Sequence, residues 1–536
     1  KGVFFFATSF NQPLANWNTA AVTDMNSIFA GAMAFNQDIG GWNTAKVTDM
    51  YAMFKGASVF NRDIGGVHSN VVEKSLRMGY NPKRRRNQNR RLKMEFSTET
   101  VIATRNLLVK EIKRHLKGRV AIDAREMEQS LREVLQEIGR ETLGEIWEMQ
   151  DEIIHKEGVS CHQHEEKRGK RHKVRRISRR EAQVNSVFGE VRYRRGYYHC
   201  ETCNHRWHEL DEEIGLRPGQ VTPKLGELVA FAGVLVPFEK AQEVVERYLL
   251  LRICANTIRH ETQAMGERQQ AQEETWLEES RDFEYLRTRR REIQQKPRRV
   301  YGSIDGVFVP LKDGWMEAKI VSWYRAGRPY GAKELRAIDV RSSISLDQAA
   351  SFGKLLWATG MQHDADLSEE VVFVCDGAVW IWKLIEKYYP KAVQIVDWYH
   401  ACEYLAAVGN ALHPHDDVQA KQWFMDQKEY LWEGQTDLVI QHCQQIKDHP
   451  SAGEEARKTI TYFTNNQKRM DYARFRQQGY FIGSGTVESS CKQIVTMRLK
   501  APGARWTQHG ALATAKARSA WLNGDWDLLA TLPLAV

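Results

Sequence analysis

Alternating and continuous runs of apolar residues mark the second half of the chain as a mixed α/β region. Between residues 300 and 345, three consecutive segments alternate as strands do: VYGSIDGVFVP, WMEAKIVSWYRA and ELRAIDVRSSI. Two later segments each join a short apolar run to a helical pattern: VVFVCDGAVWIWKLIEKYYP and AVQIVDWYHACEYLAAVG. We therefore expect three antiparallel strands followed by two strand–helix units.

Helical spacing of apolar residues dominates three other stretches. Residues 403–478 predict a helical insertion, and residues 217–299 predict several helices with a break at Pro237. A helix over Ile253–Met265 begins with polar residues, as a helix-turn-helix recognition helix does, although any amphipathic helical hairpin has a similar pattern. Residues 94–158 predict packing helices. Their apolar positions include Met127, Leu131, Val134, Leu135, Ile138 and Leu143.

Residues 10–64 carry an internal repeat of 25 residues. The repeated positions are Phe10, Phe35 and Phe60, Trp17 and Trp42, and Met25 and Met50. A fixed period of this length predicts a solenoid, whose repeats bury their apolar faces by stacking on one another. Because only two units are complete, we expect this solenoid to be marginally stable. Residues 66–93 have no such period and carry a dense basic run, which predicts either a DNA-binding arm or a solvated linker.

Length and charge narrow the class of protein. A chain of 536 residues is too long to fold around a single hydrophobic core, so we expect two to four domains. The net charge of +9 weakly favours a polyanionic partner. The eight cysteines do not suggest a disulfide framework, and neither a signal peptide nor an apolar run of eighteen residues is visible. These features predict a cytoplasmic, nucleoid-associated protein.

Two cysteine- and histidine-containing pairs predict a zinc ribbon. Cys161 and His164 form the first pair, and Cys200 and Cys203 form the second. Four such ligands suit a tetrahedral structural Zn²⁺ site, and the alternating segment SVFGEVRYRRGYYHC predicts a hairpin that brings the pairs together. Other histidines nearby compete for the fourth position. The alternative is two surface pairs that bind no metal.

Three acids and a basic track predict a site for divalent metal and DNA. The acids are Asp305 inside one apolar run, Asp376 at the end of another, and Glu488 at the start of a helix after a Gly-Ser-Gly turn. Carboxylates are preferred Mg²⁺ ligands, and two Mg²⁺ ions about 3.5–4 Å apart catalyse in-line phosphoryl transfer. Taken singly, each acid is better explained by a structural position: one in a turn, one capping a helix and one on a surface. The cations predicted to hold the DNA backbone are Lys492, Arg498, Lys500 and Arg505.

The segments SIDG, CDG, DWYH and GSGTVES…RLKAPGARW together resemble the DDE transposases of bacterial insertion sequences, most closely those of the Kra type. The resemblance extends from about Met94 to Trp526 and implies an RNase H-like catalytic core. Asp397 and His400 match an Asp-x-x-His signature, for which the resemblance implies a structural or supporting role. The positions that match the catalytic acids are Asp305, Asp376 and Glu488.

The N-terminal repeat closely resembles the leucine-rich-type repeats of BspA-like bacterial surface proteins. The abrupt change of composition after it predicts a fusion, in which the basic stretch is translated terminal DNA of a mobile element and Met94 is the original start. The predicted parts are a repeat fragment (1–65), a basic linker (66–93), a helical lead-in (94–158), a zinc ribbon (159–216), a helix-turn-helix region with a linker (217–299), an RNase H-like core (300–402 and 479–536) and a helical insertion (403–478).

Two classes of function follow. The resemblance implies Mg²⁺- or Mn²⁺-dependent cleavage of double-stranded DNA at element ends and strand transfer to target DNA, carried out by a homodimer or a larger synaptic complex. The alternative is a catalytically silent DNA-binding or surface-repeat fusion product. The presence of all three acids favours the transposase, whereas the foreign N-terminus favours the alternative. A further hypothesis is an RNase H-like nuclease that does not transfer strands. The predicted helix-turn-helix and zinc ribbon argue against it, because sequence-specific binding of element ends is needed for transposition.

Overall fold

The computed structural model describes residues 123–161, 172–292, 296–328 and 334–532, together with 105–110, 113–114 and short stretches between 4 and 43. The chain divides into two compact units, residues 1–120 and residues 121–536. Within the described residues, no helix is long and apolar enough to cross a membrane.

In the first unit, aromatic residues 25 positions apart lie side by side. Phe10 stacks on Phe35 with ring centroids 6.0 Å apart, and Trp17 stacks on Trp42 at 6.4 Å. The Trp42 indole also donates a hydrogen bond to the Leu14 carbonyl. The sequence period therefore relates residues that touch. The solenoid itself stays a prediction, and the predicted linker of residues 66–93 lies outside the described residues.

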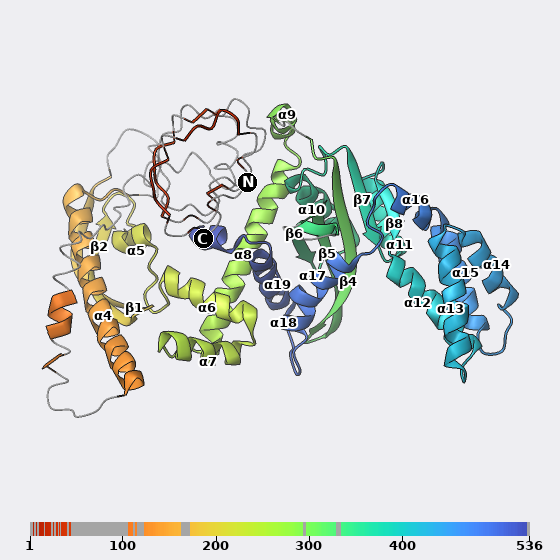
Figure 1. Ribbon diagram of the computed structural model, residues 1–536. Helices are drawn as coiled ribbons and strands as arrows, with labels where there is room; N and C mark the ends of the chain where they lie inside the picture. The colour runs from red at the N-terminus through yellow and green to blue at the C-terminus, as the bar shows by residue number, and fades with distance from the viewer. Residues whose placement is uncertain are drawn as a thin grey trace. The chain divides into compact units, whose positions relative to one another are not determined.

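A five-stranded sheet forms the centre of the second unit (Figure 1). Its strand order is β6-β5-β4-β7-β8, with β4, β5 and β6 antiparallel and with β7 and β8 parallel to β4. The three antiparallel strands and the two strand–helix units that the sequence predicts are all present. The bounds are β4 (Arg299–Leu311), β5 (Gly314–Gly327), β6 (Arg336–Ser345), β7 (Glu370–Cys375) and β8 (Val393–Val396).

Helices cover both faces of this sheet because successive residues of its central strands are buried on opposite sides. On β5, the Trp323 indole donates to Thr359 of α10, whereas Ser322 hydrogen-bonds to Ser490 of α17. One face carries α10 (Ala349–Gln362) and α11 (Val379–Tyr388). The other face carries α17 (Gly485–Cys491), α18 (Met497–Leu499) and α19 (Gln508–Leu522).

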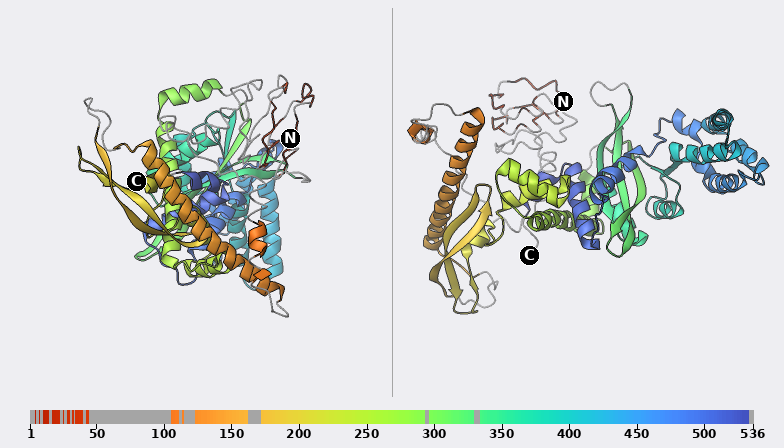
Figure 2. Two further views of the ribbon diagram at one scale, coloured as in Figure 1. Left: turned by 90° about the vertical axis from the view of Figure 1, so that its left-hand side faces the viewer. Right: turned by 90° about the horizontal axis from the view of Figure 1, so that it is seen from below.

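The secondary-structure elements of the predicted insertion (residues 403–478) are all helices. Its helices pack on one another as a group (Figure 2) and share a hydrophobic core with the sheet through Leu431, Phe463 and Tyr472. The helices are α12 (Trp398–Leu412), α13 (Asp417–Trp432), α14 (Thr436–Gln445), α15 (Gly453–Asn466) and α16 (Tyr472–Gln477).

Three helices occupy the region predicted as helix-turn-helix. They are α6 (Pro223–Leu235), α7 (Phe238–Leu249) and α8 (Ala255–Glu279), and α9 (Phe283–Glu292) follows them. Thr222 caps α6, and Pro237 separates α6 from α7 as predicted. Helix α8 crosses α19 so closely that a Cβ on Gly266 would lie 1.8 Å from the Ala513 carbonyl oxygen. This region is therefore packed on the sheet domain through α19.

The lead-in and the ribbon region form one layered unit. Helix α4 (Ala124–Glu157) packs against the predicted hairpin, whose strands are β1 (Val174–Ser186) and β2 (Gly189–Cys200); β3 (Arg206–Trp207) and α5 (Glu209–Ile214) complete it. The prediction of packing helices is confirmed for the second half of α4, where Leu143 contacts the core, whereas most of residues 94–122 lie outside the described residues. The apolar side chains of its first half are exposed: Met127, Leu131, Val134, Leu135 and Ile138.

Candidate functional site

Asp305 and Asp376 lie at neighbouring positions of adjacent parallel strands. Gly302 of β4 pairs with Phe373 of β7, and three further residues along each strand lead to Asp305 and Asp376. The Ile304 amide donates to the Cys375 Sγ, which holds the two strands together at this end. Parallel pairing thus brings together two acids that are 71 residues apart in the chain.

The turn after β7 is shaped around Asp376. Its carboxylate accepts a hydrogen bond from the Ala378 amide at 3.0 Å, and its carbonyl accepts one from the Tyr462 hydroxyl at 2.6 Å. Gly377 has a φ of +93°, and a Cβ there would lie 2.6 Å from the Tyr462 hydroxyl oxygen. The Cys-Asp-Gly turn therefore requires glycine at its last position, for both backbone and steric reasons.

Asp305 is a buried acid with a perturbed pKa. Burial raises its pKa above the usual range, and the nearby Asp376 adds to this rise. Hydrogen bonds from the Cys491 thiol (3.3 Å) and the Gly306 amide (2.7 Å) oppose it, as does the proximity of His400. Burial also raises the pKa of Cys491, so this thiol stays protonated and donates to Asp305. A divalent cation at this position would stabilise the charged form of Asp305.

Glu488 reaches the site from α17, which packs on β4 and β5. The Ser484 hydroxyl donates to its carboxylate at 3.1 Å, and the Ser484 amide donates to Asp397. Asp397 follows β8, caps α12 and also accepts from the His400 amide at 2.6 Å. One hydrogen-bonded path therefore links the Asp-x-x-His segment to the Gly-Ser-Gly turn and the third acid.

The three acids lie near one another, but their carboxylate oxygens are not all within 4.8 Å of one another. Among the described residues, only one group of three or more potential ligands has all its ligand atoms within 4.8 Å of one another, and that group contains cysteines and a histidine. The charge of Asp376 acts on Asp305, and the charges of Asp305 and Glu488 both act on the Cys491 thiol. The donor set of carboxylate oxygens suits Mg²⁺ or Mn²⁺.

Of the four cations predicted to hold DNA, Arg498 is buried and therefore cannot contact DNA. Its side chain is 2% exposed, its Nε donates to the Gly233 carbonyl at 2.8 Å, and its guanidinium lies over the Phe238 and Trp506 rings. Burial lowers its pKa to about 10. A π-helical turn at Lys492–Thr496 precedes it, and the extra residue in that turn changes the face on which Arg498 emerges.

The other members of the basic segment differ in exposure. Lys492 and Arg505 are exposed, and Lys500 is half-buried and close enough to Cys491 for its charge to act on that thiol. Trp506 is buried, and its indole donates to the Leu499 carbonyl. It therefore packs in the core and is not available to stack on a base.

A second candidate site lies beside the hairpin. Its ligand atoms come from Cys161, His172, Cys200 and Cys203. The Cys161 and Cys203 sulfurs are 3.3 Å apart, and the Cys200 sulfur is 3.5 Å from the His172 Nδ1. A tetrahedral zinc site with bonds of about 2.0–2.3 Å has ligand separations of roughly 3.3–3.8 Å. Three thiols and one imidazole at these separations fit Zn²⁺.

The electrostatics of this cluster also suit a thiolate ligand. Burial raises the pKa of Cys200, but hydrogen bonds from Cys203 and His172 outweigh it and bring the pKa to about 6. Three of the four predicted ligands thus come together. The fourth, His164, lies outside the described residues, and His172 is the histidine in the cluster. Sequence reasoning missed His172 because its spacing from Cys161 matches no short ligand pair.

Two family models match the chain. Residues 1–92 match "Mycoplasma protein of unknown function, DUF285", and residues 119–528 match "Uncharacterised protein family (UPF0236)". No curated protein matches the chain. Neither family description names an activity, so the likenesses to transposases and to BspA-like repeats remain predictions. Because the second match spans well over half of the chain, this protein belongs to the uncharacterised protein family UPF0236.

Proposed function

We propose that residues 94–536 form a DDE-type transposase, which cleaves double-stranded DNA at element ends and transfers the strands to target DNA. The observation that carries this proposal is the proximity of Asp305, in the middle of β4, to Asp376, which directly follows the adjacent parallel strand β7, with Glu488 on a helix packed against the same sheet. Each acid alone has a structural explanation. A half-buried acid beside a second acid, without an ion pair at Asp305 among the described residues, is typical of a functional site.

The architecture supports an RNase H-like core. A sheet in which three consecutive antiparallel strands are followed by two parallel strands on the other side of the first is the order that this fold requires. The sequence segments that resemble Kra-type transposases lie on β4, in the turns after β7 and β8, at the start of α12, and on α17 and α18. Both lines of support therefore concern the sheet and the elements that adjoin it.

The site residues have distinct parts in the proposed reaction. Asp305, Asp376 and Glu488 would hold Mg²⁺ or Mn²⁺, which activates the attacking oxygen and stabilises the leaving oxygen of a phosphoryl displacement. Asp397 orients the turn that carries Ser484, and Ser484 orients the Glu488 carboxylate. The Cys491 thiol holds Asp305 Oδ2 in place.

DNA contacts in this proposal come from exposed cations and from the start of α8. Lys492, Lys500 and Arg505 would bind phosphates near the acids. Asn256, Arg259 and His260 are polar, lie in the first turns of α8 and are exposed, as residues that read a groove must be. We also propose a cytoplasmic protein in a bacterial cell, acting as a homodimer or larger synaptic complex, with structural zinc in the hairpin unit.

The second candidate is a catalytically silent DNA-binding or surface-repeat fusion product. One observation favours it: in the described part of the chain, the carboxylate oxygens of the three acids are not all within 4.8 Å of one another. In this case the acids would hold the fold together and the cations alone would bind DNA.

Metal-dependent cleavage of a labelled duplex from the element end separates the two candidates. We expect Asp305→Asn, Asp376→Asn and Glu488→Gln each to lower the cleavage rate by at least about a hundredfold, because each removes a metal ligand. Asp313→Asn, an exposed acid in the turn between β4 and β5, is the matched control and should retain full activity. Full cleavage by any of the three variants would remove that residue from the site. DNA binding without cleavage by the unaltered chain would favour the silent protein.

A further inference from the structure

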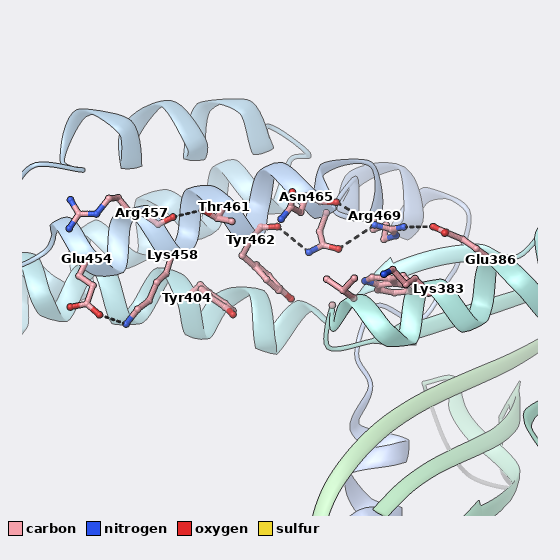
Figure 3. Close-up of a pocket in the computed structure, with 14 residues that line it drawn as sticks. Lys383, Glu386, Tyr404, Glu454, Arg457, Lys458, Thr461, Tyr462, Asn465 and Arg469 are labelled. Atoms are coloured by element: carbon pink, nitrogen blue, oxygen red, sulfur yellow. Dashed lines mark hydrogen bonds and ion pairs between the residues drawn. The ribbon is translucent and has the colours of Figure 1, made fainter. Parts of the chain in front are cut away.

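A groove of about 920 Å³ adjoins the acid site. It lies between α11 of the sheet domain and α12 and α15 of the insertion (Figure 3). Gly377, which directly follows Asp376, forms part of its wall, and Tyr462 from α15 donates to the Asp376 carbonyl. The groove therefore begins at one of the proposed metal ligands and leads away along the insertion.

Cations lie at both ends of this groove. Lys383 on α11 is exposed and forms no hydrogen bond or ion pair with its side chain among the described residues. Arg457 on α15 is exposed at the other end, where it donates to the Lys447 carbonyl and its charge acts on Glu454 without forming an ion pair. The two acids of the lining, Glu386 and Glu454, are already paired with cations. The groove thus has an excess of positive charge.

One face of α15 presents a row of polar groups along the groove. Arg457, Thr461 and Asn465 follow one another at intervals of four residues and are all exposed. At about 1.5 Å per residue the row is about 12 Å long. With phosphates spaced roughly 3.4 Å along a strand, this length suits a segment of only a few nucleotides.

A pair of tyrosines lies between the cations. Tyr404 of α12 and Tyr462 of α15 stack with centroids 4.1 Å apart and ring planes 11° from parallel, and both are half-buried (Figure 3). The ring pair is fixed, since Tyr462 is anchored on Asp376. Aromatic rings next to a cationic track form the usual surface for unpaired bases. A base inside a duplex is stacked on its neighbours and cannot reach such a ring.

From these observations we infer that the groove binds single-stranded DNA that continues from the phosphate at the acid site. Phosphates would contact Lys383 and Arg457, and one unpaired base would contact Tyr404. This inference rests on the proposed function, because it takes the acid site as the point where the strand is cut. It also gives the insertion a task that the acids do not perform, which is to hold the strand that leaves the site.

The salt dependence of binding tests the inference with the full chain and a fluorescent 20-nucleotide oligo-dT. Each phosphate contact adds about 0.7 to the slope of log affinity against log salt for a single strand. We expect Lys383→Gln to reduce this slope by about 0.7. Lys387→Gln, one turn further along α11 and outside the groove, should leave the slope unchanged. Equal slopes for Lys383→Gln and the unaltered chain would overturn the inference.

The tyrosine contact has its own readout. Tyr404→Leu should weaken oligo-dT binding about tenfold at every salt concentration, because a stacking contact releases no counterions. Unchanged affinity in a folded Tyr404→Leu protein would overturn the base contact. The two measurements distinguish failure of the groove proposal from failure of the transposase proposal. If Lys383→Gln reduces the salt slope but no cleavage occurs, the groove binds a strand and the transposase proposal is rejected. If cleavage occurs but Lys383→Gln leaves the salt slope unchanged, the transposase proposal stands and the groove proposal is rejected.

Discussion

At the scale of single residues, the candidate site depends on the carboxylate of Asp397. It is 1% exposed and accepts backbone hydrogen bonds from His400 and Ser484, which lie on two different segments. Ser484 in turn donates to Glu488. Asp397 therefore connects the segment after β8 to the turn before α17, and we propose that the Asp-x-x-His signature positions that turn.

Asp397→Asn should weaken metal use more than it weakens the fold. The neutral amide loses charge-assisted hydrogen bonds worth about 1–3 kcal/mol of unfolding free energy, and the Mg²⁺ concentration for half-maximal cleavage should rise roughly tenfold. Urea unfolding and Mg²⁺ titration of cleavage measure the two effects. The matched control is Asp416→Asn, which removes the charge from a similar cap on α13. An equal rise in Mg²⁺ requirement in both variants would contradict the positioning role.

Arg498→Met should lower stability without changing DNA affinity. The buried guanidinium packs on two aromatic rings and binds a backbone carbonyl, so its loss should cost about 1–3 kcal/mol of unfolding free energy. Arg505→Gln should instead reduce the salt slope of duplex binding by about 0.9 and leave stability unchanged. Urea unfolding and salt-dependent binding measure both variants. A reduced salt slope for Arg498→Met would restore its predicted DNA contact.

At the scale of elements, the hairpin unit should depend on one zinc ion. β1, β2 and β3 form a small sheet with few buried side chains around Cys200, and a bound metal would supply folding free energy there. We expect one Zn²⁺ per chain, lost in His172→Ala and retained in His199→Ala, whose ring faces Asn204. Elemental analysis of the purified proteins measures this. Zinc lost in His164→Ala but kept in His172→Ala would restore the ligand that the sequence predicts.

At the scale of the whole molecule, activity should reside in the part that follows Met94. All candidate acids, cations and zinc ligands lie within residues 119–528, which one family model matches, whereas residues 1–92 match another. A shortened chain that begins at Met94 should cleave the element-end duplex at least as fast as the full chain. Cleavage by the shortened chain alone would make the N-terminal repeat inhibitory. Cleavage by the full chain alone would contradict this assignment.

The sequence by itself determined the local elements of this protein. Strands β4 to β8, the hairpin of β1 and β2, the break at Pro237 and the helical insertion all follow from short-range periodicity, capping and turn residues. These signals act between residues that are close in sequence, so they do not depend on the conformation of distant segments. For the same reason, the sequence placed Asp305, Asp376 and Glu488 in or next to their strands and helix. It did not give the distances between the three acids.

Only the tertiary structure decided which of these residues meet and which are covered. Arg498 is buried by Gly233, 265 residues away, and His172 joins a cluster with Cys200 across the hairpin. The first half of α4 leaves its apolar face exposed, and the groove beside Asp376 forms between α11 and α15. Each outcome depends on contacts between distant segments of the chain. The local residue pattern of one segment does not determine which distant segment it contacts.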